Sequence, residues 1–186
     1  MMITRLRSFR ILTLASLALL ALPLSSFAGT VQAYLLISSD MKDSIISTDP
    51  KERDMLVKGD WKLNGTGNLQ TAAEKGAVPL HRLARSGTGA TDRLLEANAT
   101  KVAAHVKQGF NDEGVLGFVS AEAAPGLLPV YHFTQGSRHF WLMNKQDQAA
   151  AEAKGWKASG VSFWLWPVTS QPASTAKAAA KPTTAK

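Results

Sequence analysis

Apolar and polar positions along this chain follow one order three times. Each copy begins with a short apolar run, which is followed by a turn of small and polar residues and by a second apolar pair. A helix start, a glycine at the helix end, an aromatic residue and a last apolar run complete the copy. Repetition at a nearly fixed period indicates a repeat architecture. The copies extend over residues 31–72, 77–122 and 127–168.

The short apolar runs predict strands. In each copy the first run and the second apolar pair flank a turn, which is typical of a β-hairpin. The first runs are residues 34–37, 80–83 and 130–133, and the second pairs are Ile45-Ile46, Leu94-Leu95 and Phe140-Trp141. A glycine-bearing turn and a final strand follow the helix, so the pattern predicts four short strands in each copy.

The segment between the second and third strands of each copy predicts a short helix. Asp49-Pro50-Lys51-Glu52 places an acceptor at the N-cap, proline at the first helical position and glutamate at N3, which together satisfy free amides at a helix start. Asn98 and Asn144 take the capping place in the other copies, with Asp147 three residues after Asn144. Glycines are expected just past each helix end; they are Gly59, Gly109 and Gly155.

These elements predict a mainly β domain with three short helices over residues 29–168. No copy can bury its own apolar face, but three copies around a pseudo-threefold axis can close into a barrel with a hairpin cap. An open solenoid is the alternative, although it would leave two sheet edges exposed and the sequence has no capping segments. We therefore expect a β-trefoil-like fold of three pseudo-symmetric repeats.

The third copy carries the fullest version of the pattern. It consists of Pro129-Val130-Tyr131-His132-Phe133, Gly136, His139-Phe140-Trp141, Gly155-Trp156 and Gly160-Val161-Ser162-Phe163-Trp164. This order resembles the repeat of a bacterial secreted-domain family of unknown function. The first copy has Ser44, and the second Arg93, where the family has the histidine. The resemblance implies a threefold, trefoil-like form and an exported location, and the family has no established catalytic residues.

The first 28 residues are typical of an export signal. Arg5, Arg7 and Arg10 precede an apolar run over residues 11–24, and Ser26-Phe27-Ala28 resembles a cleavage site. The run is shorter than the roughly 20 residues that cross a bilayer, which disfavours an uncleaved anchor. No cysteine follows the site, so a lipoprotein anchor is excluded. We expect a periplasmic or secreted protein with no transmembrane segment after cleavage.

The two ends of the chain account for its basic charge. The formal net charge is +7, but the first 28 residues hold three arginines and residues 169–186 hold three lysines, with no acid in either segment. Residues 29–168 are therefore nearly neutral, which argues against a nucleic-acid partner. Residues 169–186 contain no large apolar side chain and are expected to form a disordered cationic tail.

The sequence offers little for catalysis. The chain has no cysteine and no Gly-x-Ser-x-Gly turn, so an exported hydrolase is disfavoured. His132 and His139 are expected to lie near each other across a hairpin, but two imidazoles without a carboxylate or thiolate make a poor metal site. His105 is expected to pack or to face solvent from its helix. We expect no enzyme, no cofactor and no metal.

Aromatic side chains gather in the third copy. This copy is also the one that has a histidine, His139, where the other two have Ser44 and Arg93. Strand alternation sends Trp164 and Trp166 to the face opposite Phe163, and Trp141 and Trp166 are expected to be exposed. An exposed indole suits sugar stacking or a protein contact. The candidate ligand-binding residues are Tyr131, Arg138, His139, Trp141, Trp164 and Trp166.

These observations predict a monomeric, exported, non-enzymatic recognition module. Its expected partner is a glycan or cell-envelope polymer, bound through the third copy. The alternative is a protein-interaction or inhibitor module that acts on a protease, a toxin or an envelope protein.

Overall fold

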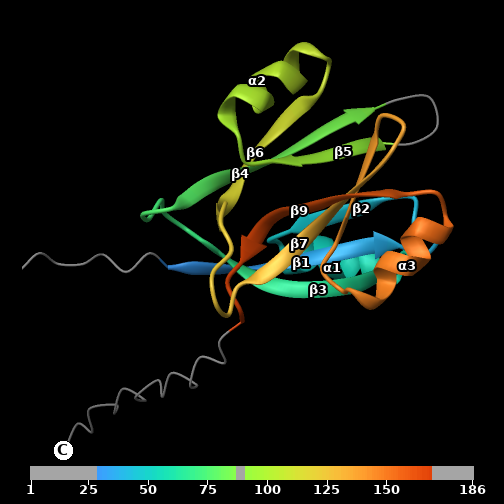
Figure 1. Ribbon diagram of the computed structural model, residues 1–186, viewed down its shortest axis with the longest axis horizontal. Helices are drawn as coiled ribbons and strands as arrows, with labels where there is room; N and C mark the ends of the chain where they lie inside the picture. Colours follow the sequence, from blue (N-terminus) through green and yellow to red (C-terminus); the bar gives the residue numbers. More distant parts are fainter. Residues whose placement is uncertain (1–28, 87–90, 169–186) are drawn as a thin grey trace, which may run out of the picture.

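The computed structural model describes residues 29–86 and 91–168 (Figure 1). The expected export signal and the expected tail lie outside the described residues. The elements in chain order are β1 (Thr30–Ser38), β2 (Ser44–Ser47), α1 (Pro50–Lys58), β3 (Trp61–Gln70), β4 (Ala77–Ser86), β5 (Thr91–Glu96), α2 (Ala99–Lys107), β6 (Asn111–Ser120), β7 (Leu128–Gln135), β8 (Arg138–Leu142), α3 (Gln146–Ala153) and β9 (Lys157–Leu165). The expectation of a mainly β chain with three short helices is confirmed.

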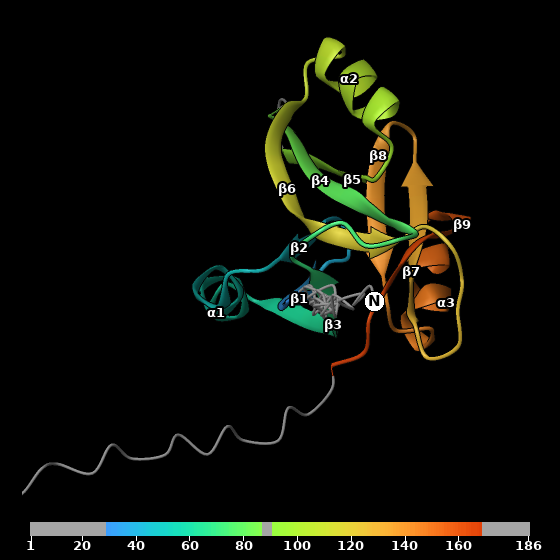
Figure 2. The ribbon, with the colours of Figure 1, turned by 90° about the vertical axis from the view of Figure 1, so that its left-hand side faces the viewer.

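The order strand, strand, helix, strand occurs three times, and we call these segments unit 1 (30–70), unit 2 (77–120) and unit 3 (128–165). In each unit the first strand lies between the other two, and every pairing is antiparallel. The units lie around a common centre in Figure 2. They join at the ends of their last strands, where β3 pairs with β6 and β6 pairs with β9.

The prediction of twelve short strands is wrong, because the described residues form nine strands in one open antiparallel sheet. The glycines expected in turns, Gly65, Gly114 and Gly160, lie inside the long strands β3, β6 and β9. The registers of these strands shift where one extra residue enters the ladder. Such bulges bend a strand without ending it, so the aromatic residue and the last apolar run of each unit belong to one strand.

The capping predictions are confirmed for the first two helices. The Asp49 carboxylate accepts from the Lys51 amide at 2.8 Å, and the Asn98 side chain accepts from the amides of the second and third residues of α2. Asn144 accepts from the Gln146 amide at 3.0 Å, although α3 begins one residue later than expected. Glu52 does not return to the cap as the capping-box pattern predicts, because its carboxylate contacts Ser47 and a guanidinium from β4 instead.

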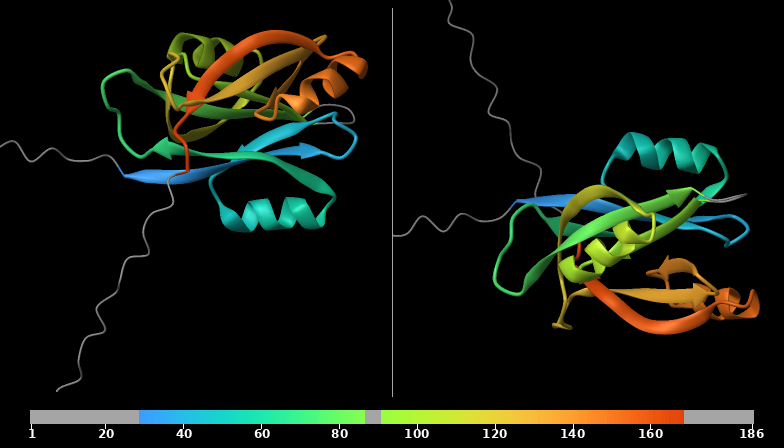
Figure 3. Two further views of the ribbon diagram at one scale, coloured as in Figure 1. Left: turned by 60° about the horizontal axis from the view of Figure 1, so that its bottom comes forward. Right: turned by 90° about the horizontal axis from the view of Figure 1, so that it is seen from above.

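The largest apolar cluster draws residues from all three units, and it includes Leu35, Ile46, Leu83, Leu94 and Trp141. The β7–β8 hairpin is buried on both faces, because Phe133 and Phe140 belong to a second cluster under α3. The helices lie apart from one another at the periphery (Figure 3). None of the helices in residues 29–86 and 91–168 has the length and apolar character needed to cross a bilayer.

Candidate functional site

A hollow of about 560 Å³ lies between unit 2 and unit 3. Helix α2 and the end of β5 form one wall, and β7, β8 and β9 form the other. Its apolar lining is Leu94, Leu95, Ala97, Ala104 and Val161, and its polar lining is Glu96, Lys101, His105, His132, His139 and Ser162. Because three of the four histidines of the chain line this space, we call it the histidine hollow.

Strand alternation places two of these histidines on one face of the β7–β8 hairpin. His132 in β7 pairs across the ladder with Trp141 in β8, and His139 lies two residues before Trp141. Side chains two apart on a strand share a face, and paired residues share it too. The three rings therefore point toward unit 2, whereas Phe133 and Phe140 point toward α3.

The three rings are stacked. The centroids of His132 and His139 are 5.2 Å apart with an angle of 13° between the planes, and those of His132 and Trp141 are 5.0 Å apart with an angle of 18°. Nε2 of His132 lies 3.0 Å from Nδ1 of His139, which is a hydrogen bond between one donor and one acceptor nitrogen. The expected proximity of these histidines across the hairpin is confirmed.

The pair is held in its uncharged form. Burial, together with the nearby His139 and Lys101, lowers the pKa of His132 to about 4. Burial also lowers the pKa of His139. A doubly protonated pair would lose the acceptor of the hydrogen bond as well. The hollow therefore presents a neutral imidazole pair at neutral pH.

The wall formed by unit 2 carries the charges. Oε1 of Glu96 accepts from the Asn98 amide at 2.8 Å, and Oε2 lies 3.9 Å from Nε2 of His105. Lys101 and His105 are four residues apart on α2 and both line the hollow. Nδ1 of His105 is buried and has no hydrogen-bond partner in the described part of the chain. The spacing of Lys101 and His105 could have indicated a polar face on α2, but not the element that this face meets.

The structure does not bring the six predicted site residues together. Trp141 was expected to be exposed, and this is wrong, because its side chain is only 1% exposed beneath the imidazole pair. Its ring is covered because both faces of the hairpin are packed. Tyr131 packs against the cluster under α3, on the face away from the hollow. Of the six, only His139 lines the hollow.

The other predicted residues lie at two further places. Arg138 donates to the Lys42 carbonyl and borders a smaller hollow of about 300 Å³ beside Trp156. Trp164 pairs with Ser120 where β9 meets β6, and Trp166 pairs with Asn68 of β3. Both indoles are partly exposed. These residues lie at contacts between units.

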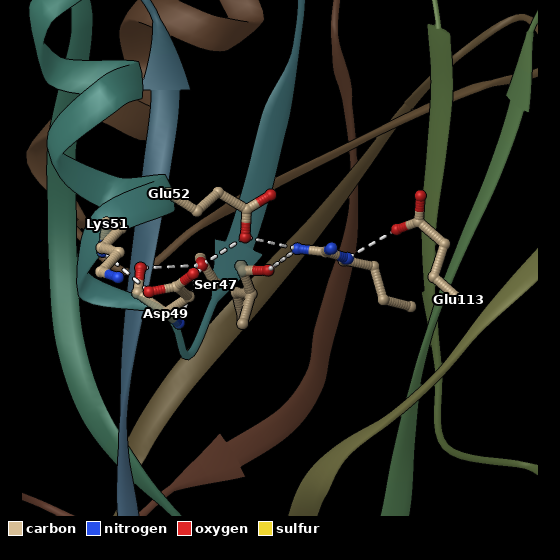
Figure 4. Close-up of polar contacts among 7 residues, drawn as sticks. Ser47, Asp49, Lys51, Glu52 and Glu113 are labelled. Carbon is tan, nitrogen blue, oxygen red and sulfur yellow. Dashed lines mark hydrogen bonds and ion pairs between the residues drawn. The ribbon is translucent and has the colours of Figure 1, made fainter.

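The junction between unit 1 and unit 2 is closed by an ion cluster. Arg82 of β4 donates to Glu52 of α1 at 2.9 Å and to Glu113 of β6 at 2.6 Å. Its guanidinium also donates to the Ile46 carbonyl at 3.2 Å. Glu52 and Glu113 approach it from opposite sides (Figure 4). The cluster fills the space between the helix of one unit and the strands of the next.

The junction between unit 3 and unit 1 is also closed by polar contacts. Asn64 of β3 donates to Asp147 of α3 at 2.7 Å and accepts from the amides of Met143 and Asn144. Met143 further packs against Gly65, where an added Cβ would lie 2.7 Å from the Met143 Cβ. At two junctions, then, an acidic side chain in the first turn of a helix meets the next unit.

Residues 30–166 match the model of a family described as a domain of unknown function, DUF5648. The chain belongs to this family. No curated protein and no solved structure matches it. The family description assigns this DUF5648 domain no activity.

The side chains that line the hollow of the DUF5648 domain offer both polar and apolar contacts. Among residues 29–86 and 91–168 no group of three or more histidine, cysteine, aspartate or glutamate side chains is placed to hold a metal ion. The imidazole pair has one ring N–H and one acceptor nitrogen left beside its own hydrogen bond, and the leucines, alanines and valine offer apolar contact. A concave site with this mixture fits a small polar ligand.

Proposed function

We propose that this protein is an exported, non-enzymatic recognition module that binds a saccharide unit of a glycan or cell-envelope polymer in the histidine hollow. The observation that carries the proposal is the contrast between the junctions. Side chains of the chain itself bridge two of them, through Arg82 and through Asn64. The third is left open over about 560 Å³.

The lining of the hollow fits a sugar ring. Sugars present apolar C–H faces together with hydroxyl groups that both donate and accept. The hollow places Leu94, Leu95 and Val161 near two neutral imidazoles and Ser162. Its volume lies within the range of about 300–1,000 Å³ typical of small-ligand sites. The polar groups come from five elements, which suits a ring with groups around its edge better than an extended peptide.

We also propose that the three units are pseudo-symmetric repeats in a trefoil-like arrangement. The repeated element order and the shared place of the first strand support this. So do the last strands, which meet one another in turn through β3–β6, β6–β9 and the Asn68–Trp166 bridge. Gly67 against Leu165 and Gly117 against Leu69 are two further contacts of the same kind, where an added Cβ would lie under 3 Å from the leucine Cβ.

Filling the hollow tests the function. Ala104 lies on the hollow side of α2, whereas the neighbouring Ala103 is exposed and does not line it. We expect the full chain to bind members of a glycan array or insoluble peptidoglycan, Ala104→Trp to abolish this binding, and Ala103→Trp to retain it. Absence of binding by the wild type, or equal binding by both variants, would count against the proposal.

A protein-interaction or inhibitor module is the second proposal, and it is supported by α1. This helix buries none of its residues, and Met55 is 67% exposed. Val57 on the same helix and Leu63 on β3 are about half exposed. Large exposed apolar side chains are candidate anchors for a protein contact. Copurification of one stoichiometric partner from envelope extract, lost in Met55→Ser with Val57→Ser and retained in Ala104→Trp, would favour this function.

A further inference from the structure

The two oppositely charged side chains that line the histidine hollow, Glu96 and Lys101, differ in whether they contact a partner. The Glu96 carboxylate accepts from the Asn98 amide at the start of α2 and lies near His105. Lys101, in contrast, is exposed at the hollow. No carboxylate lies within ion-pair distance of its ammonium in the described part of the chain. The hollow thus holds an exposed ammonium group that forms no ion pair with the described residues.

The closed junction between units 1 and 2 provides a comparison for Lys101. There the residue three positions after the helix cap is Glu52, and the strand residue that meets it is Arg82. In the open junction, Lys101 takes the place of Glu52, because it lies three residues after the cap Asn98. His132 takes the place of Arg82, because each is the third residue of the first apolar run of its copy. The helix carries a cation instead of an anion, and the strand offers a neutral ring. Glu96 is the one carboxylate among the residues that line the hollow, and it contacts the Asn98 amide and His105 but forms no ion pair with Lys101.

We infer that the histidine hollow selects a saccharide unit that bears a carboxylate, with Lys101 as its counter-charge and the one free ring N–H of the neutral His132–His139 pair as a hydrogen-bond donor. The inference rests on the proposed function and narrows its ligand to acidic sugars. Charge-assisted hydrogen bonds of this kind are about twice as strong as neutral ones. They gain further where water is partly excluded. Lys101 therefore decides between an acidic and a neutral sugar.

Proton uptake should accompany binding. His132 faces His139 of β8 and Lys101 of α2. His139 faces Asp92 and Glu96 of β5, together with His105 of α2 and Arg85 of β4. A carboxylate beside the pair raises the pKa of both imidazoles, because it favours their charged forms. Affinity for an acidic sugar should therefore increase as the pH falls from 8 to 5.5.

Paired sugars test the inference by isothermal titration with the full chain. Methyl glucuronide is compared with methyl glucoside, and N-acetylmuramic acid with N-acetylglucosamine. At least one acid should bind about tenfold more tightly than its neutral counterpart, which corresponds to about 1.4 kcal/mol. Lys101→Gln should remove this difference. Lys107→Gln, at the exposed end of the same helix, should leave it unchanged.

The outcomes separate the two proposals. Equal affinity for an acid and its neutral counterpart, lost in Ala104→Trp, overturns the acidic ligand and retains the recognition function. Binding of neither member of either pair, together with silence on the glycan array, overturns both. A tripeptide with a free carboxyl end serves as a third arm beside its amide. If the tripeptide binds in a Lys101-dependent way and none of the sugars does, the proposal of a saccharide ligand is overturned.

Discussion

At the residue scale, Trp141 shows that the alternation of side chains along a strand does not predict which face of the strand is buried. The alternation of β8 correctly separates His139 and Trp141 from Phe140, but it cannot say which face is covered. Here both faces are covered, by the cluster under α3 and by unit 2. A hairpin with apolar side chains at nearly every position is compatible with either face being exposed. Only the packing of the units decides that Trp141 is core.

The burial of Trp141 predicts a large stability effect. Trp141→Ala removes a side chain that is 1% exposed and stacked on two imidazoles, and it should lower the free energy of unfolding by about 3–5 kcal/mol. Trp164→Ala, at a partly exposed indole, should lower it by less than half as much. Urea unfolding monitored by circular dichroism measures both. Equal losses would contradict the placement of Trp141 in the core.

The pKa of His132 predicts a pH dependence of stability. Between about pH 4 and 6.5 the unfolded chain takes up a proton at this residue that the folded chain does not. Stability contributed by neutral His132 is therefore lost as the pH falls through this range. Burial raises the pKa of Asp43 to about 6, which acts in the opposite direction.

Comparison of the wild type with His132→Gln isolates the histidine from Asp43. The difference in urea midpoint between the two proteins should shrink as the pH is lowered from 7 to 4. A difference that is constant over this range would show that the pKa of His132 does not change on folding.

At the element scale, local chemistry predicted the helices and missed the length of the strands. A capping side chain acts on amides two or three residues away, so Asp49 and Asn98 could be assigned from the sequence. A glycine at positive φ serves a turn and a bulge equally well. Gly114 and Gly160 have φ values of 104° and 97° inside strands. The choice between turn and bulge depends on the neighbouring strand, which the local sequence does not contain.

The ion cluster at Arg82 should be the polar contact that matters most for joining unit 1 to unit 2. Arg82→Gln leaves Glu52 and Glu113 facing each other without a cation between them. Since a hydrogen-bonded charged group is worth about 1.5–3 kcal/mol, the loss should be about 2 kcal/mol. The control Lys51→Gln, at an exposed side chain of α1, should stay within about 0.5 kcal/mol. A loss no larger than that of the control would mean that solvent replaces the cluster.

At the scale of the whole molecule, the candidate site belongs to a junction and not to a repeat. The sequence placed His132 and His139 together because one hairpin holds both. Glu96, Lys101 and His105 were missed because they come from the preceding unit. Which helix meets which hairpin follows from how the last strands of the units join. That arrangement is set by long-range pairing, which no local pattern encodes.

The join between unit 3 and unit 1 can be tested at the end of the described chain. Trp166 and Asn68 exchange two backbone hydrogen bonds, of 2.7 and 3.1 Å, and the buried Asn68 amide donates to the Pro167 carbonyl at 3.0 Å. A chain that ends at Leu165 leaves all three groups of Asn68 without these partners, whereas a chain that ends at Val168 keeps them. Each unpaired buried group costs about 1–3 kcal/mol, so the shorter chain should be less stable by about 3 kcal/mol or more in urea.

Asn68→Ala in the full chain separates the side-chain contact from the backbone pair. This variant removes only the hydrogen bond to Pro167 and should cost about 1 kcal/mol. Hydrogen exchange of the Asn68 amide should then remain slow in the variant and become fast in the chain that ends at Leu165. Equal urea midpoints for the two shortened chains would mean that β3–β6 and β6–β9 hold the units together without the third contact. The remaining contacts between units 3 and 1, those of Asn64 with α3 and of Gly67 with Leu165, would then be sufficient to keep the arrangement closed.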